Sequence, residues 1–64
     1  MKKIKEGSRI ITKVKKGGVP AFTKGVLVYI YLGTNLCEVE IWDKNGVPVD
    51  VVLYNIDEIK LLKE

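Results

Sequence analysis

Few side chains of this chain could take part in bond-making chemistry. The sequence contains no histidine and a single cysteine, Cys37, which lies in an apolar alternation where burial would suppress its thiolate. It contains no phosphate-binding loop, no dinucleotide fingerprint, no cysteine–histidine cluster and no catalytic triad. A chain of 64 residues is also too short to enclose readily a ligand pocket of roughly 300 Å³. We therefore expect no enzymatic activity, no cofactor, no metal site and no small-molecule substrate.

Aromatic and acidic side chains are the more informative groups, because they alternate with apolar positions in the middle of the chain. Period-two alternation directs these residues away from the core, and the candidate partner-binding set is Tyr29, Tyr31, Trp42, Glu38 and Glu40. Tyrosine and tryptophan are common interface anchors, and exposed apolar patches rimmed by charge usually contact a partner. We expect this face to bind another protein or a second copy of the chain. The alternative is that the first loop or the termini cover it.

Basic side chains are concentrated in the first third of the chain. Residues 1–24 contain seven lysines and Arg9 against Glu6 alone, whereas residues 25–64 contain three lysines against seven acidic residues, and the net charge is +3. One interpretation is that the basic segment neutralises the acidic one within a single small fold. The other is a cationic patch that binds phosphates or an acidic partner. In that case the candidate nucleic-acid contacts are Arg9, Lys13, Lys15, Lys16 and Lys24.

Residues 36–54 are expected to form the β-hairpin that carries much of the aromatic face. The predicted core rows are Cys37, Val39 and Ile41 on the first arm and Val49, Val51 and Leu53 on the second. A three-residue loop, 44–46, joins these rows and predicts a positive φ at Gly46. Pro48 then requires an edge strand or a bulge, because it cannot donate a ladder hydrogen bond. The same register sets Glu40 opposite Asp50, a repulsion that a partner's cation would relieve.

The remaining elements follow from alternation and from glycine, proline and asparagine signals. Residues 8–14 are predicted as a first strand with Ile10 deepest, and residues 15–24 as a loop in which Phe22 closes one end of the core. Residues 25–32 are predicted as a second strand. Its predicted core row is Val26, Val28 and Ile30, and Ile30 is expected to pair with Cys37. Asn55 is expected to cap one helical or 3₁₀ turn before a last strand at 59–63.

This order of elements predicts an all-β fold, a five-stranded SH3-like barrel with a 3₁₀ turn before the last strand, in one domain spanning 1–64. The runs Gly25-Val26-Leu27-Val28 and Glu38-Val39-Glu40-Ile41-Trp42-Asp43-Lys44-Asn45-Gly46 resemble a family of short bacterial proteins of unknown function. Their pattern is Gly-x-Val-Val, then Val-Glu-Phe and a polar turn with Asp and Gly. The resemblance implies the barrel fold and, from toxin-like neighbours of some members, an antitoxin or immunity role. It implies no site residues.

No stretch has the apolar core of a signal peptide or the length of a membrane span, so we expect a cytoplasmic protein. Two function classes remain. The first is a non-catalytic protein-interaction or regulatory (antitoxin-like) module that uses the aromatic face. The second is a nucleic-acid-binding barrel that uses the basic first strand and loop. We favour the first, because acidic groups beside the aromatic residues would repel phosphates, and nucleic acid would then use the opposite side.

Overall fold

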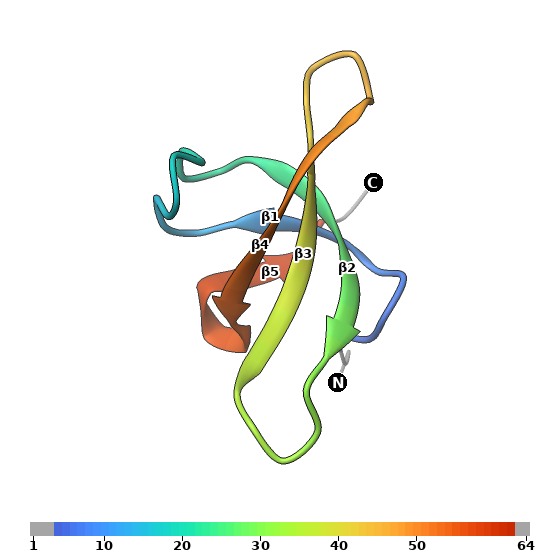
Figure 1. The fold of residues 1–64 in the computed structure, drawn as a ribbon, viewed down its shortest axis with the longest axis vertical. Coiled ribbons are helices and arrows are strands. Elements are labelled where there is room, and N and C mark those ends of the chain that lie inside the picture. Colours follow the sequence, from blue (N-terminus) through green and yellow to red (C-terminus); the bar gives the residue numbers. More distant parts are fainter. Residues whose placement is uncertain (1–3, 63–64) are drawn as a thin grey trace.

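The computed structural model describes residues 4–62, which form one antiparallel sheet in the order β4-β3-β2-β1-β5 (Figure 1). The elements are β1 (Arg9–Thr12), β2 (Lys24–Ile30), β3 (Leu36–Trp42), β4 (Pro48–Asn55), the 3₁₀ helix η1 (Ile56–Glu58) and β5 (Ile59–Leu61). The predicted all-β fold, with five strands and a 3₁₀ turn before the last, is confirmed. Across the described part of the chain no pairing joins β4 to β5, so the sheet is curled but not closed.

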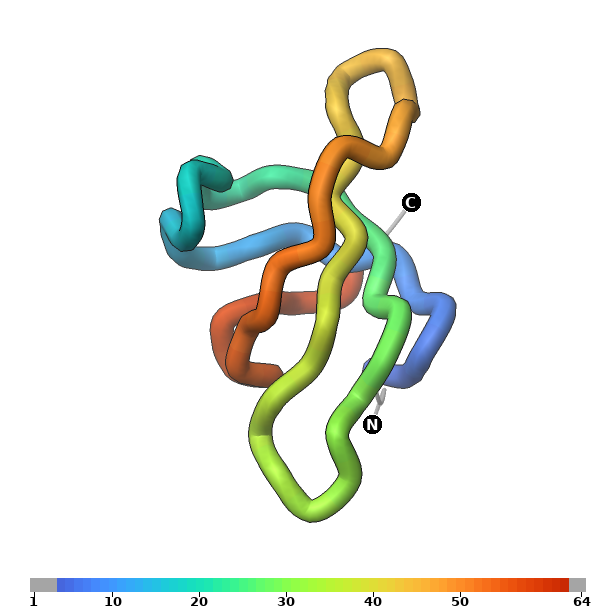
Figure 2. Tube along the Cα trace, viewed as in Figure 1, coloured from blue at the N-terminus to red at the C-terminus, as the bar shows by residue number. Residues whose placement is uncertain are grey.

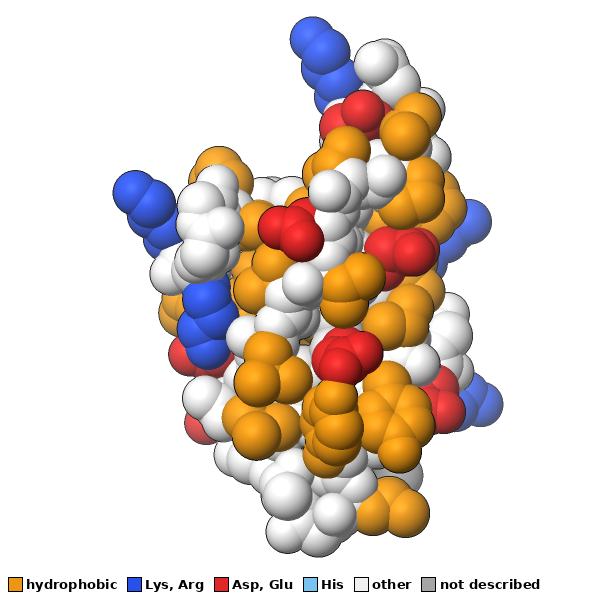
Figure 3. All heavy atoms as spheres, viewed as in Figure 1, with side chains coloured by type: hydrophobic (Ala, Val, Ile, Leu, Met, Phe, Trp, Pro, Cys, Tyr) orange, Lys and Arg blue, Asp and Glu red, His pale blue; other side chains and the backbone are white. Residues whose placement is uncertain are grey.

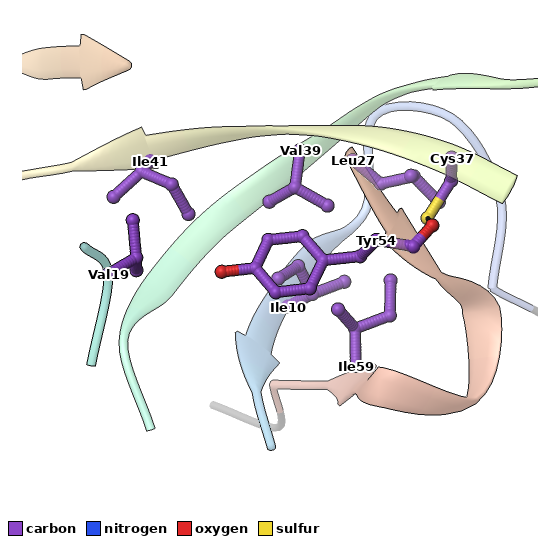
Figure 4. Close-up of a cluster of buried hydrophobic side chains, with 8 residues drawn as sticks. All are labelled: Ile10, Val19, Leu27, Cys37, Val39, Ile41, Tyr54 and Ile59. Atoms are coloured by element: carbon purple, nitrogen blue, oxygen red, sulfur yellow. Dashed lines mark hydrogen bonds between the residues drawn. The ribbon is translucent and has the colours of Figure 1, made fainter. Parts of the chain in front are cut away.

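The core lies inside the curl of the sheet, where every strand contributes at least one buried side chain (Figure 4). The buried hydrophobic residues are Ile10, Val19, Leu27, Cys37, Val39, Ile41, Tyr54 and Ile59. Ile10 is fully buried, as predicted, and so is the row formed by Cys37, Val39 and, almost completely, Ile41. The ring of Tyr54 lies in the middle of this cluster, between strands that are far apart in the sequence.

The β3–β4 hairpin has the predicted turn but a different register. The Asp43 amide donates to the Val47 carbonyl over 2.9 Å, and Gly46 has the predicted positive φ of 78°. Immediately beyond the turn the pairing shifts, because Trp42 opposes Pro48 whereas Ile41 opposes Asp50. The extra residue, Val49, forms a β-bulge, and β4 is an edge strand of the sheet. Both features accommodate Pro48, which has no N–H to donate to a neighbouring strand.

This bulge reverses the two faces of β4 relative to the prediction. Val52 opposes Val39 and Tyr54 opposes Cys37, so that Tyr54 is buried and Val52 is partly buried. The row predicted to be in the core points outward, and its exposed fractions are 59% for Val49, 52% for Val51 and 45% for Leu53. The inward row is Asp50, Val52 and Tyr54, which contains a carboxylate, so alternation alone favoured the other row and only the bulge reverses that choice.

A second bulge, at Val28, reverses half of the predicted β2 row. Ile30 pairs with Cys37 as predicted, but Leu27 opposes Val39 and is fully buried. The predicted core positions of Val26 and Val28 are wrong, since Val26 opposes Glu40 of the outer face and Val28 is exposed. Gly25 of β2 pairs with Ile41 of β3 and lies close to the β3 backbone. A Cβ at this position would come within 2.6 Å of the Glu40 carbonyl oxygen, so only glycine fits without a backbone shift.

The loop between β1 and β2, residues 13–23, closes the core side of the curl at one end (Figure 2). Val19 is its buried residue. The prediction that Phe22 fills this place is wrong, since its side chain is 70% exposed and its φ is 66°. Hydrogen bonds from the Phe22 amide to the Thr12 carbonyl (2.8 Å) and from the Thr23 amide to Thr12 Oγ1 (2.9 Å) hold the backbone in this conformation.

One carboxylate joins this loop to η1. Glu58 Oε1 accepts hydrogen bonds from the Asn55 amide (2.8 Å) and from Lys16 Nζ (2.5 Å), and Lys16 lies over the Tyr54 ring, 5.3 Å from its centroid. Asn55 is the N-cap residue of η1, as predicted. The hydrogen bond from Lys16 lowers the pKa of Glu58, and the backbone hydrogen bond from Asn55 acts in the same direction.

Candidate interaction surface

The outer face of the sheet, opposite the core, carries the candidate partner-binding residues in cross-strand rows. On β3 this face presents Leu36, Glu38, Glu40 and Trp42, which alternate with the buried row. Glu38 lies between Tyr29 of β2 and Leu53 of β4, and Glu40 lies between Val26 and Val51. Figure 3 shows hydrophobic side chains gathered over β2, β3 and β4 with acidic groups among them, while basic groups lie mostly toward the margins.

Tyr29, Tyr31 and Glu38 form a contact cluster at one end of this face. The two rings pack edge to face, with centroids 4.8 Å apart and an interplanar angle of 77°. The Tyr31 hydroxyl donates a hydrogen bond to Glu38 Oε2. This bond raises the pKa of Tyr31, because ionisation of the hydroxyl would remove the donor and place two negative charges together. Both rings keep exposed surface, so the cluster offers aromatic faces beside a carboxylate.

Glu40 and Trp42 form a second pair on the same face, in which Trp42 Nε1 donates to Glu40 Oε1 over 3.0 Å. The predicted opposition of Glu40 and Asp50 is wrong, because the bulge moves Asp50 opposite Ile41. Asp50 instead accepts a hydrogen bond from the Val51 amide over 2.8 Å. All five predicted partner-binding residues thus lie on the outer face, on β3, on β2 or just beyond the end of β2. They form two groups, one held by a ring contact and a hydrogen bond and the other by a hydrogen bond.

Sequence reasoning missed the third part of this surface, the outward row of β4. Val49, Val51 and Leu53 extend the aromatic cluster into an apolar strip across three strands, and Leu36 is exposed beside it. The signal for it in the sequence is Pro48, which requires an edge or a bulge but does not fix the position of the bulge. A hollow of about 530 Å³ adjoins the strip beyond Tyr29, and Lys5, Glu6, Ile30 and Leu32 complete its lining.

The edge of β4 is poorly suited to pair with another strand. Pro48 has no amide hydrogen, the Val51 amide is bonded to Asp50, and the Asn55 amide is bonded to the Glu58 carboxylate over 2.8 Å. Proteins commonly protect sheet edges by such means. A partner would therefore contact the outer face rather than extend the sheet at β4.

The five basic residues predicted as nucleic-acid contacts do not form one group. Lys16 is engaged with Glu58 and with the Tyr54 ring. Lys13 and Lys15 are exposed on the first loop, whereas Arg9 is exposed on β1 opposite Val26. Lys24 lies at the start of β2, opposite Ile11 of β1, and Ile11 in turn opposes Lys60 of β5. Lys24 and Lys60 therefore flank Ile11 in one row.

The most reactive type of side chain in the sequence, the thiol of Cys37, is packed in the core. Cys37 is fully buried, and burial raises the pKa of its thiol, with the charge of Glu58 acting in the same direction. Within residues 4–62, no three His, Cys, Asp or Glu side chains come close enough to hold a metal ion. No helix in the same range is long and apolar enough to cross a membrane.

Comparison of the chain with protein-family models, with curated proteins and with solved structures found no match.

Proposed function

We propose that this chain is a small non-catalytic protein-binding module whose outer face recognises a partner segment with basic and apolar side chains. The observation that supports the proposal is the exposed strip of Tyr29, Tyr31, Leu53 and Val51 with Glu38 at its centre. A soluble fold rarely leaves so many neighbouring apolar side chains on one face without a partner. Aromatic rings are also the side chains that most often anchor protein interfaces.

The carboxylates define the partner's charge. Glu38 accepts a hydrogen bond from the Tyr31 hydroxyl and Glu40 accepts one from the Trp42 indole, and an ionised carboxylate offers about four acceptor positions. An arginine side chain from the partner would bond bidentately to the free positions of Glu38 and stack on a tyrosine ring beside it. Apolar side chains on either side of that arginine would contact Leu53 and Val51.

A second copy of this chain is a poorer occupant of the same face. A two-fold contact would bring Glu38 and Glu40 of both copies together and desolvate four carboxylates without a cation. Addition of a strand at β4 is opposed by Pro48 and by the bonded amides of Val51 and Asn55. The first loop is also not positioned to cover the face, because Lys16 and Val19 bind it to the core side.

The proposal includes an SH3-like barrel fold, supported by the strand order β4-β3-β2-β1-β5 and by η1 directly before β5. It also includes the resemblance to short bacterial proteins, with a regulatory, antitoxin-like role. In such a role the acidic face would cover a basic surface of the partner. The single cysteine is a buried thiol that forms no disulfide in this chain, which suits the reducing cytoplasm, the proposed location.

The experiment is a selection of peptide binders from a random displayed library against the immobilised protein. We expect the recovered peptides to carry arginine or lysine between apolar residues. Binding should be lost in Tyr31→Ala and in Leu53→Lys, because the first removes an aromatic face and the second adds a positive charge that repels the basic partner. Lys15→Ala, a surface change outside the outer face, is the matched control and should bind as the wild type does. Recovery of acidic peptides, or binding that survives Leu53→Lys, would refute the proposal.

A further inference from the structure

A hollow of about 460 Å³ lies at the other end of the outer face, between the β3–β4 turn and the start of β2. Its lining residues are Lys24, Trp42, Asp43, Lys44 and Gly46. Two lysines thus flank the only tryptophan of the chain. The Tyr29 cluster is not part of this hollow, so it constitutes a separate candidate site.

The polar groups of the hollow are not equally free to bind a ligand. Asp43 Oδ1 accepts hydrogen bonds from the Asn45 amide (2.8 Å) and the Val47 amide (3.0 Å), which dedicates this carboxylate to the turn. The indole N–H of Trp42 is bonded to Glu40. The side chains of Lys24 and Lys44 are exposed, whereas the two nearby carboxylates, Asp43 and Glu40, are engaged with the turn and with the indole. The hollow therefore favours an anion beside an aromatic ring.

The cationic character continues from the hollow across the sheet. Lys24 opposes Ile11 of β1, and Ile11 opposes Lys60 of β5, so the outer face places Lys60 two strands away from Lys24. Neighbouring strands lie about 4.8 Å apart, which sets the two lysines roughly 10 Å apart at their strands. An extended polyanion that enters at Trp42 and runs across β2 and β1 would meet a third lysine there.

We propose that the hollow at Trp42 binds single-stranded nucleic acid. One base stacks on the exposed part of the indole ring, and adjacent phosphates contact Lys24 and Lys44. Stacking on an aromatic side chain combined with lysine–phosphate contacts is the common mode of single-strand recognition without sequence preference. The strand continues toward Lys60 and away from Glu40 and Glu38 on β3, whose charges repel phosphate. This site is independent of the peptide-binding strip, and neither proposal requires the other.

Fluorescence of Trp42 provides the test, because the chain has no other tryptophan. Oligothymidine of eight nucleotides is titrated into the protein at 20 mM and at 200 mM salt. We expect saturable quenching of Trp42. Two phosphate contacts on a single strand correspond to a salt slope of about −1.4, so the tenfold rise in salt should weaken binding about 25-fold.

The variant Lys24→Ala/Lys44→Ala should lose most of the binding and most of the salt dependence. Lys13→Ala/Lys15→Ala removes the same charge from the first loop and should bind as the wild type does. Absence of quenching at 20 mM salt, or equal loss of affinity in the two double variants, would overturn the proposal. Equal binding of an oligoglutamate of matched charge would also overturn it, since the hollow would then recognise acidic protein rather than a base.

Discussion

Replacement of Tyr54 by phenylalanine should stabilise this protein, although it removes a polar atom from a fully buried side chain. The Tyr54 hydroxyl is buried, and it has no hydrogen-bond partner among residues 4–62. Its oxygen points toward the end of the core formed by Val19 and Ile41 (Figure 4). In the unfolded chain the same hydroxyl is bonded to water, so folding costs its hydration without replacement.

The magnitude follows from this lost hydration. A buried polar group without a partner costs about 1–3 kcal/mol, and Tyr54→Phe removes that cost while retaining the ring. The ring contacts with Val39 and Ile10 remain, and Lys16 keeps an aromatic face beneath it at 5.3 Å. In a domain of this size each kcal/mol raises the melting temperature by about 4–8 °C.

Urea and thermal unfolding of the wild type and of Tyr54→Phe measure the difference. Tyr29→Phe is the matched control, because its ring is half exposed and its free energy of unfolding should change by no more than about 0.5 kcal/mol. Burial, with the charge of Glu58, raises the pKa of Tyr54. Because the folded pKa of Tyr54 is raised, its contribution to stability is fully present below the unfolded tyrosine pKa and is lost as pH rises through the folded pKa. The phenylalanine variant should not show this decrease of stability at alkaline pH. A destabilised Tyr54→Phe would refute the reasoning, since its hydroxyl would then have a bonding partner.

Three further predictions concern the core, the close contact between Gly25 of β2 and the β3 backbone, and the Lys16–Glu58 pair. Val39→Asp should unfold the domain, as seen by loss of amide-shift dispersion, because it buries a charge without a partner; a folded variant would contradict the assigned core. Gly25→Ala should lower the free energy of unfolding by about 1–3 kcal/mol in urea, because its Cβ overlaps the Glu40 carbonyl, and an unchanged value would show that the sheet relaxes freely. The lowered pKa of Glu58 contributes stability above the unfolded carboxyl pKa, and this stability is lost as pH falls through the folded pKa. The free energy of unfolding, measured from pH 7 to pH 2, should therefore fall less in Glu58→Gln than in the wild type. Identical pH profiles would show that the Lys16–Glu58 pair does not stabilise the fold.

The turns and the centre of the sheet were predictable because their signals are local. Asp43 and Gly46 have the side chain and the backbone freedom that their turn requires, and the loop and the positive φ were both predicted. Asn55 likewise marks the start of η1. On β3, apolar and acidic residues alternate strictly from Cys37 to Ile41, so the assignment of Val39 and Cys37 to the core did not depend on any neighbouring strand.

The outward row of β4 could not be predicted, because a bulge changes the phase of an alternation without changing its composition. Val49, Val51 and Leu53 are more apolar than the inward row of Asp50, Val52 and Tyr54, and only the extra residue after Pro48 turns them outward. Phe22 was misplaced for a related reason, since the Thr12 hydrogen bonds set its backbone and direct its ring outward. The candidate site was therefore predicted in its aromatic and acidic parts and missed in its aliphatic part.

The outer face should recognise basic and apolar side chains together. An amide chemical-shift titration of the labelled protein tests this recognition, with a peptide of alternating arginine and leucine and with its glutamate–leucine counterpart. We expect saturable shifts at Tyr29, Tyr31, Glu38 and Leu53 with the arginine peptide and none there with the glutamate peptide. Shifts of equal size with both peptides, or none at these residues with the arginine peptide, would contradict it.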